Sequence, residues 1–197
     1  MNSEHLVRTA PLRIVAYPVL DGAIVAGPLL DAESKKRAPL AGTQQPVNLS
    51  MRQGDEIIYV ERAFSERSGM QVVRAIGGRA PLHLTSVGKL FLAADDPQRV
   101  RSYATRTGLQ GHTKNSITEL SNLERELSKV RQYGQANDNE ELELGVRCMA
   151  AGIYDDQEKL VAGLSISAPS GRMDDHWLPK LKETAREISQ ALGYTGG

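Results

Sequence analysis

The segment from Gly77 to Lys89 constrains the fold of this chain more than any other stretch. Its glycine pair predicts a tight turn, and an extended stretch follows. Thr85 or Ser86 is suited to cap a helix, because a short side-chain oxygen accepts from backbone N–H groups two or three residues later. The apolar residues that follow share one helical face: Val87, Leu90, Phe91 and Ala94. Since a helix start carries unpaired N–H groups and a partial positive charge, this turn predicts a site for a small anion such as a carboxylate.

Alternating apolar and polar residues predict strands on both sides of that helix. A hairpin is expected from Val47–Met51 and Glu56–Arg62, and a third short strand from Gln71–Ile76. A second hairpin is expected from Val146–Tyr154 and Leu160–Ala168, which are joined by a polar connection.

Further helix signals separate the two hairpins. Asp96-Pro97 predicts a second helix, with Asp as the cap and Pro at the first helical position. Ser116–Glu119 has the spacing of a capping box, and Gly134 marks the end of the third helix. A last helix is expected from Asp174 or Asp175 to Gly193. Strands, helices, strands and a helix together predict an α+β fold, a mixed and largely antiparallel sheet with helices packed against it.

The first part of the chain is read as an appendage. Prolines and glycines exclude one long helix from residues 1–42, although short helical pieces over Val7–Ile14 and after Pro18 are compatible with the sequence. We expect residues 1–42 to be an irregular N-terminal linker, in which 22–42 is extra material and a possible insertion. Residues 43–197 are expected to form the main domain.

Composition excludes several classes of protein. Lys+Arg and Asp+Glu both number 24, so the basic excess of a dedicated nucleic-acid module is missing. The single cysteine, Cys148, excludes an internal disulfide and fits a reducing cytoplasm. The chain has no apolar run long enough to span a bilayer and no signal-peptide pattern at its N-terminus, so we expect a cytoplasmic protein without a membrane partner.

One strand carries two different faces. On Leu160–Ala168, alternation places Leu160, Ala162, Leu164 and Ile166 on one side. Val161, Gly163, Ser165 and Ser167 fall on the other, where the hydroxyls can bond either to neighbouring backbone or to a ligand. From the residues alone, Cys148 is expected to be a buried core thiol and Asp138 a solvated loop acid.

Three motifs in order resemble the effector-binding domain of IclR-type bacterial transcriptional regulators. They are Gly77–Lys89, Gly145–Ala151 and Gly163–Pro169, and the resemblance runs from about Thr43 to about Tyr194. It implies a GAF/profilin-like sheet, a small organic acid as effector, and a homodimer or homotetramer. It also implies DNA binding only through a winged helix-turn-helix domain, which is not evident in this chain.

The resemblance also implies which residues form the site. The positions that match effector contacts are Ser86, Val87, Asp138, Cys148, Ser165 and Ser167. Apolar wall positions match Val72, Ala80 and Val146. Some relatives have Gly and Ala at the positions of Ser86 and Val87, so the site here should be smaller or redirected there.

Two rival functions remain open. An enzyme acting on a small carboxylate would require Ser165, Ser167, His83 and Asp138 to converge, and an oligomerisation module would bind no ligand. The enzyme is disfavoured because Gly163–Ser167 stops short of a Gly-x-Ser-x-Gly elbow. His83 is expected to pack or to bond locally, and no cofactor or metal site is predicted because no histidine has a partner at ligand spacing.

Overall fold

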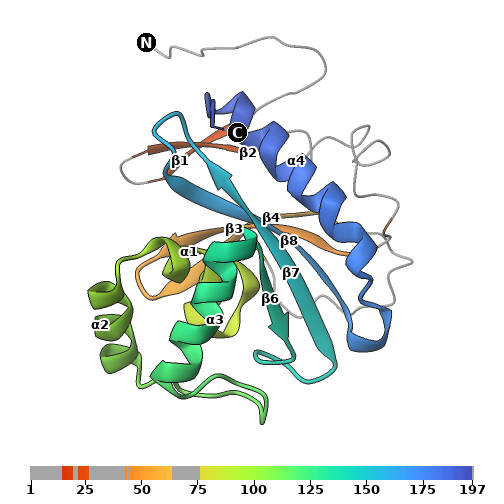
Figure 1. The fold of residues 1–197 in the computed structure, drawn as a ribbon. Coiled ribbons are helices and arrows are strands. Elements are labelled where there is room, and N and C mark those ends of the chain that lie inside the picture. Colours follow the sequence, from red (N-terminus) through yellow and green to blue (C-terminus); the bar gives the residue numbers. More distant parts are fainter. Residues whose placement is uncertain (1–14, 20–21, 27–42, 44, 64–75, 197) are drawn as a thin grey trace.

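The structure is a computed structural model, and it describes residues 15–19, 22–26, 43, 45–63 and 76–196. Its centre is a six-stranded antiparallel sheet in the order β5-β4-β3-β8-β7-β6 (Figure 1). The strands are β3 Val47–Gln53, β4 Glu56–Ala63, β5 Arg79–Pro81, β6 Ala136–Asn139, β7 Val146–Tyr154 and β8 Leu160–Pro169. The helices are α1 Ser86–Ala94, α2 Pro97–Thr107, α3 Leu120–Tyr133 and α4 Leu178–Ala191. The predicted α+β class is confirmed.

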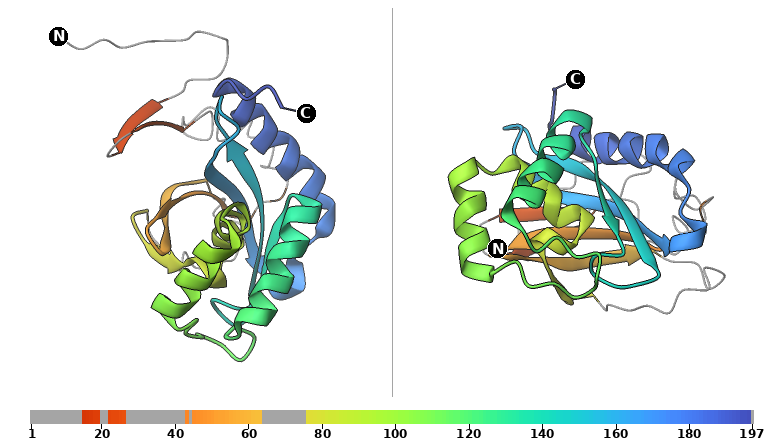
Figure 2. Two further views of the ribbon diagram at one scale, coloured as in Figure 1. Left: turned by 60° about the vertical axis from the view of Figure 1, so that its left-hand side comes forward. Right: turned by 60° about the horizontal axis from the view of Figure 1, so that its bottom comes forward.

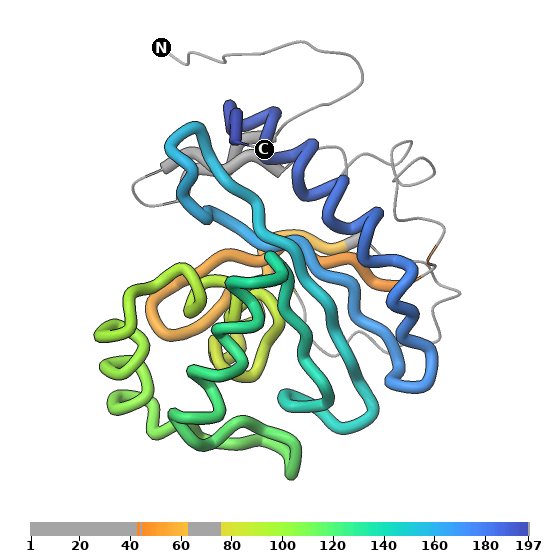
Figure 3. The backbone as a smooth tube through the Cα atoms, in the orientation of Figure 1, coloured from red at the N-terminus to blue at the C-terminus, as the bar shows by residue number. Residues whose placement is uncertain are grey.

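Both predicted hairpins are present, and they pair with each other through β3 and β8 (Figure 3). The turn between β3 and β4 includes Gly54, whose φ of 65° favours glycine. β7 matches its predicted range, and β8 extends one residue beyond it, to Pro169. The two central strands of the sheet, β3 and β8, therefore come from the beginning and the end of the domain. The helices between the two hairpins in the sequence pack on one face of this sheet.

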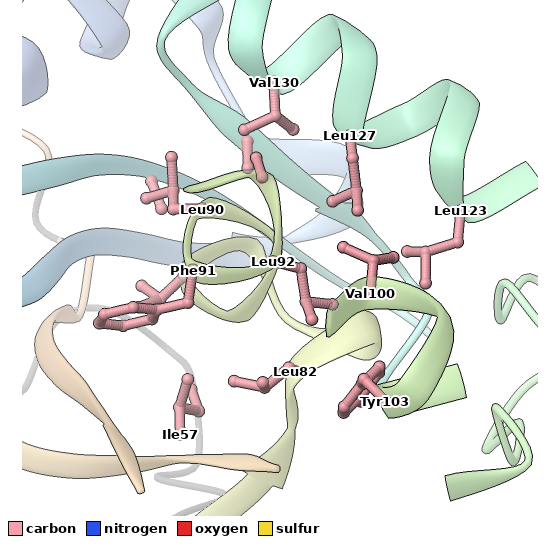
Figure 4. Close-up of a cluster of buried hydrophobic side chains, with 14 of the residues drawn as sticks. Ile57, Leu82, Leu90, Phe91, Leu92, Val100, Tyr103, Leu123, Leu127 and Val130 are labelled. Atoms are coloured by element: carbon pink, nitrogen blue, oxygen red, sulfur yellow. The ribbon is translucent and has the colours of Figure 1, made fainter. Parts of the chain in front are cut away.

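Helices α1 and α3 cover one face of the sheet, and α2 packs outside them (Figure 1). Their apolar residues form one buried cluster with Ile57 of β4 (Figure 4). Within it, Leu123, Leu127 and Val130 recur at the three- and four-residue spacing of one α3 face. A fully buried side chain of this size stabilises a fold by roughly 1.5–3 kcal/mol, so this cluster fixes α1 against the sheet.

Helix α4 covers the opposite face (Figure 2). Leu181, Ala185 and Ile188 pack against apolar residues of β7 and β8, such as Leu164. The predicted alternation on β8 is wrong at its start, where Leu160 joins the α1 cluster and Val161 contacts the α4 cluster. The β7–β8 register shifts between Ile153 and Tyr154, which changes the side to which the first residues of β8 point.

Two of the four expected helices begin with the cap residue that the sequence predicted. Thr85 caps α1 by accepting from the Gly88 N–H, and Asp96 caps α2 by accepting from the Arg99 N–H. The capping box at Ser116 is wrong: α3 begins at Leu120, and the Ser116 hydroxyl donates to the Glu141 carbonyl oxygen instead. Asp174 caps a short 3₁₀ turn that leads into α4.

Residues 15–26 were not expected to form strands. β1 (Val15–Val19) and β2 (Gly22–Ala26) form an antiparallel pair, so the helix expected after Pro18 is wrong. The helical piece over Val7–Ile14 lies outside the described residues, as does all of the Gln71–Ile76 strand except Ile76. The domain boundary at residue 43 stays a prediction. Among the described residues, no helix is long and apolar enough to cross a membrane.

Candidate functional site

A line of polar side chains crosses the face of the sheet that α1 covers. In register, Asp138 of β6 is opposite Cys148 of β7, Cys148 is opposite Ser167 of β8, and Ser165 is opposite Asn48 of β3. Asn48 is also opposite Arg62 of β4. Residues directly opposite each other in an antiparallel sheet share a face. We call this set the polar row: Arg62, Asn48, Ser165, Ser167, Cys148 and Asp138.

Side-chain contacts connect much of the polar row. Arg62 Nε donates to Asn48 Oδ1 at 2.6 Å, and Asn48 Nδ2 donates to Ser167 Oγ at 3.1 Å. Ser167 Oγ lies 3.2 Å from Cys148 Sγ. A hydrogen-bonded path thus runs through side chains of four adjacent strands.

The start of α1 lies beside this row. A Cβ atom added at Gly163 would lie 2.6 Å from Val87 Cγ1, so Val87 packs directly on the backbone of β8 there. Ser165 is the next residue of β8 on the same face, about 6–7 Å further along the strand. The N–H groups of Ser86 and Val87 belong to the first turn of α1, where helix geometry supplies no intrahelical acceptor. The start of α1 thus packs on β8 two residues before Ser165, and a shared ligand site for the helix start and the serine hydroxyls stays a prediction.

The hydroxyl groups on this face keep hydrogen-bonding capacity. Ser167 Oγ accepts from Asn48 and lies 3.2 Å from Cys148 Sγ, so its O–H can donate either to that sulfur or to a ligand. Ser165 is 4% exposed and has no hydrogen-bonded side-chain partner among the described residues. Ser50, opposite Gly163 on β3, is fully buried, and its Oγ is likewise unpartnered within the described part of the chain. Buried hydroxyls normally have partners, so these two are candidates for a ligand contact.

Asp138 corrects the expectation of a solvated loop acid. It lies on β6 with 2% exposure, and its Oδ1 accepts from the Glu141 N–H at 2.8 Å. Burial raises the pKa of Asp138 to about 7, with the nearby Glu141 carboxylate adding to the rise. Near neutral pH this carboxyl group can therefore either donate or accept a hydrogen bond.

A buried ion pair that sequence reasoning missed holds this region together. Lys89 Nζ lies 2.6 Å from Glu141 Oε1 and donates to the Asn137 carbonyl oxygen at 2.8 Å. Lys89 is the residue that follows Gly88 in α1, and a buried lysine requires a carboxylate partner. These two contacts, at Asn137 and Glu141, lie on either side of Asp138 in the sequence, so Lys89 connects α1 to the segment that carries Asp138.

Cys148 has no nucleophilic character. Burial raises the pKa of its thiol to about 12, and the Asp138 carboxylate adds to the rise. Since the thiolate is the reactive form, this thiol is inert at neutral pH. Cys148 is half-buried rather than fully buried, so the expectation of a buried core thiol is met only in part, and its side chain contacts Ser167 in the polar row.

The His83 ring is hydrogen-bonded to neighbouring protein groups. Its Nδ1 lies 2.6 Å from Tyr103 Oη, and its Nε2 lies 3.1 Å from the Gln110 carbonyl oxygen. Burial lowers the pKa of His83, so the ring is neutral, with Nε2 donating to Gln110 and Nδ1 accepting from Tyr103. Both ring nitrogens are occupied, which matches the expectation of local bonding and leaves the enzyme constellation without its base.

Two of the three predicted wall residues lie in the described part of the chain, on different strands of the sheet. Ala80 is buried on β5 in the α1 cluster, whereas Val146 is half-buried at the start of β7. Three strands separate β5 from β7 in the sheet. Val72 lies outside the described residues. In the described part of the chain, no three His, Cys, Asp or Glu side chains are grouped in a way that could hold a metal ion.

Comparison with known proteins identifies the class of protein that this fold represents. Residues 39–194 match the family described as bacterial transcriptional regulator IclR C-terminal. The chain is 33% identical over 173 residues to the HTH-type transcriptional repressor AllR of Escherichia coli K12. It therefore belongs to the family of IclR transcriptional regulators, and the part matched is the C-terminal, ligand-binding domain.

Solved structures agree. The Thermotoga maritima IclR structure has a TM-score of 0.74 and 34% identity over 83% of this chain and 67% of its own. A double mutant of the inducer-binding domain of PobR from Acinetobacter, in complex with 3-hydroxybenzoic acid, has a TM-score of 0.72 and 26% identity over 80% of this chain and 95% of its own. The AllR match covers 86% of this chain but 61% of AllR. Its relatives are transcriptional regulators, not enzymes.

Proposed function

We propose that this chain is a sensor domain that binds a small carboxylic acid on the α1-facing side of the sheet. One observation carries the proposal: Val87, in the first turn of α1, packs on β8 at Gly163, two residues before Ser165, whose hydroxyl has no hydrogen-bonded side-chain partner among the described residues. A helix start and hydroxyl donors together suit an anion.

In the proposed complex, the carboxylate accepts from the Ser86 and Val87 N–H groups and from the Ser165 hydroxyl. Ser167, Cys148 and Asp138 face the remainder of the ligand. Each buried charge-assisted hydrogen bond contributes about 1.5–3 kcal/mol, and ordering and desolvation consume part of that. A net of about 5–8 kcal/mol corresponds to roughly sub-millimolar to micromolar affinity.

PobR supports the ligand class. Its inducer-binding domain has the same fold, and a double mutant of it was solved with 3-hydroxybenzoic acid, a small acid with a second polar group. Asp138 of this chain is suited to such a second group, because a carboxyl that titrates near pH 7 can donate to a carbonyl or accept from a hydroxyl.

The regulatory output follows from linkage. AllR is an HTH-type repressor that is longer than the part matched here, so we propose that this domain acts on an attached winged helix-turn-helix domain. Ligand binding shifts a conformational equilibrium only by its differential affinity for the two states. Assembly into a homodimer or homotetramer is part of the same proposal, as is a cytoplasmic location.

Calorimetry with lactate, glycolate, benzoate and 3-hydroxybenzoate tests the proposal. We expect at least one acid to bind, and the Ser165→Ala/Ser167→Ala variant to weaken that binding by about tenfold or more, the equivalent of one hydrogen bond. Ser170→Ala, at a half-buried serine beyond the end of β8, is the matched control. No binding by the wild type would favour a ligand-free oligomerisation module, and equal affinity of the double variant would exclude the serines.

A further inference from the structure

Arg62 ends the polar row at the edge opposite Asp138, and the proposed function leaves it unused. Its Nε donates to Asn48 Oδ1 at 2.6 Å, and Asn48 donates to Ser167 Oγ at 3.1 Å. Asn48 is 1% exposed and lies opposite Ser165 in the register. One side chain therefore separates the guanidinium from both serines.

A β-bulge directs Arg62 to this face. Along β4, Tyr59 pairs with Ser50 and Glu61 with Leu49, so Val60 is the extra residue. In a regular strand, residues three apart point to opposite faces. Here the bulge places Tyr59 and Arg62 on the same side, with the guanidinium carbon 5.7 Å from the Tyr59 ring centroid. Bulges of this kind re-aim side chains next to functional sites.

Within the described part of the chain, the charge of Arg62 has no carboxylate partner. Among the described residues, no carboxylate lies within ion-pair distance of its guanidinium, since Glu61 contacts only the Arg62 backbone N–H. Burial lowers the pKa of Arg62, which reports an environment unfavourable to an unpaired cation. The two terminal nitrogens form a planar fork that matches a carboxylate.

We propose that Arg62 is a specificity-determining residue, whose guanidinium supplies the counter-charge for the carboxylate held beside Ser165. This inference rests on the proposed function and adds to it a selectivity for charged ligands over neutral ones. The site takes an anionic acid and rejects a neutral ligand of the same shape, because only the anion compensates the half-buried cation.

Matched pairs of ligands separate charge recognition from simple packing. Calorimetry compares 3-hydroxybenzoate with 3-hydroxybenzamide, and lactate with lactamide, on the wild type, Arg62→Gln and Arg62→Lys. Gln keeps a donor for Asn48 but loses the charge, whereas Lys keeps the charge but loses the fork. Arg99→Gln, at a side chain that is 74% exposed on α2, is the control.

We expect Arg62→Gln to weaken acid binding by about 10- to 100-fold and to leave amide binding unchanged. The acid affinity of Arg62→Lys should fall between those of the wild type and Arg62→Gln. Equal losses for acid and amide would overturn charge recognition. Unchanged acid binding in Arg62→Gln, together with a loss in the Ser165→Ala/Ser167→Ala variant, would overturn this inference and leave the proposed function intact. If the wild type binds no acid, the proposed function itself fails.

Thermal unfolding establishes whether each variant folds. If Arg62→Gln is unfolded, the inference is tested by the ratio of acid affinity to amide affinity, measured for the wild type and for Arg62→Lys. A wild-type ratio of tenfold or more that falls in Arg62→Lys supports the inference. A ratio near one in the wild type contradicts it.

Discussion

Lys89 and Glu141 form a buried ion pair, with side chains that are 0% and 6% exposed and a separation of 2.6 Å between Nζ and Oε1. Removing one partner of such a pair leaves an uncompensated buried charge, which costs about 3–5 kcal/mol of stability. We therefore expect Lys89→Met to lower the free energy of unfolding by that amount in urea denaturation. Glu141→Gln should recover part of the loss when combined with it.

The exposed pair Lys180–Glu183 on α4 supplies the control for Lys89→Met. Exposed ion pairs contribute little, since water and salt screen them. Lys180→Met should leave the urea midpoint unchanged. If Lys89→Met is as stable as Lys180→Met, the ion pair does not hold β6 and the loop after it.

Asp138 should make stability depend on pH. Its pKa in the folded chain is about 7, above the ordinary value of 3.8, so the folded state binds the proton more tightly than the unfolded state. Its contribution is therefore greatest below pH 4 and is lost as the pH rises toward 7. Glu141, Lys89 and Cys148 are the ionisable groups that face it.

Asp138→Asn removes this proton while keeping an oxygen that accepts from the Glu141 N–H. Relative to the variant, we expect the wild type to lose about 2–3 kcal/mol of unfolding free energy between pH 5 and pH 8. Urea denaturation at a series of pH values measures this difference. Parallel curves for the two proteins would show that Asp138 titrates at its ordinary pKa.

The contact between Val87 and Gly163 should be strongly coupled. A Cβ atom at residue 163 would lie 2.6 Å from Val87 Cγ1, so Gly163→Ala forces α1 away from the sheet and costs about 1–3 kcal/mol. Val87→Ala makes room for the added methyl group. In a double-mutant cycle, the combined variant should therefore be more stable than the sum of the single changes predicts. Strict additivity would contradict the packing of α1 on β8.

Tyr103→Phe tests the structural role of His83. The Tyr103 hydroxyl contacts His83 Nδ1 and accepts from the His83 backbone N–H, so its loss leaves two buried groups without a partner. We expect a loss of about 1–3 kcal/mol in stability, with acid affinity unchanged in calorimetry. A loss of affinity without a loss of stability would instead place His83 in the binding site.

The two hairpins β3–β4 and β7–β8 were predictable because local signals agreed with the final structure. Val146–Tyr154 is mostly apolar and is bounded by a glycine and a polar turn, and its predicted range is the observed one. Ser116 shows the limit of such reading. Its spacing to Glu119 fits a capping box, but its hydroxyl donates to a carbonyl distant in sequence, which no local pattern reveals.

The site was predictable only in part. Period-two alternation placed Ser165 and Ser167 on one face, and that face does look toward α1. The polar stretch around Asp138 gave no strand signal, since it lacks β-branched and aromatic residues. Arg62 is on this face because of a bulge, and a bulge changes the period that the prediction assumes.

An experimental structure of this chain with a bound acid tests the central claim most directly. Using 3-hydroxybenzoate or the tightest acid found by calorimetry, we predict a carboxylate within hydrogen-bond distance of the Ser86 or Val87 N–H and of Ser165 Oγ. The other end of the ligand should face Ser167 and Asp138. An acid bound on the α4-facing side of the sheet, or side chains that fill the space over Ser165 and exclude any ligand, would contradict it.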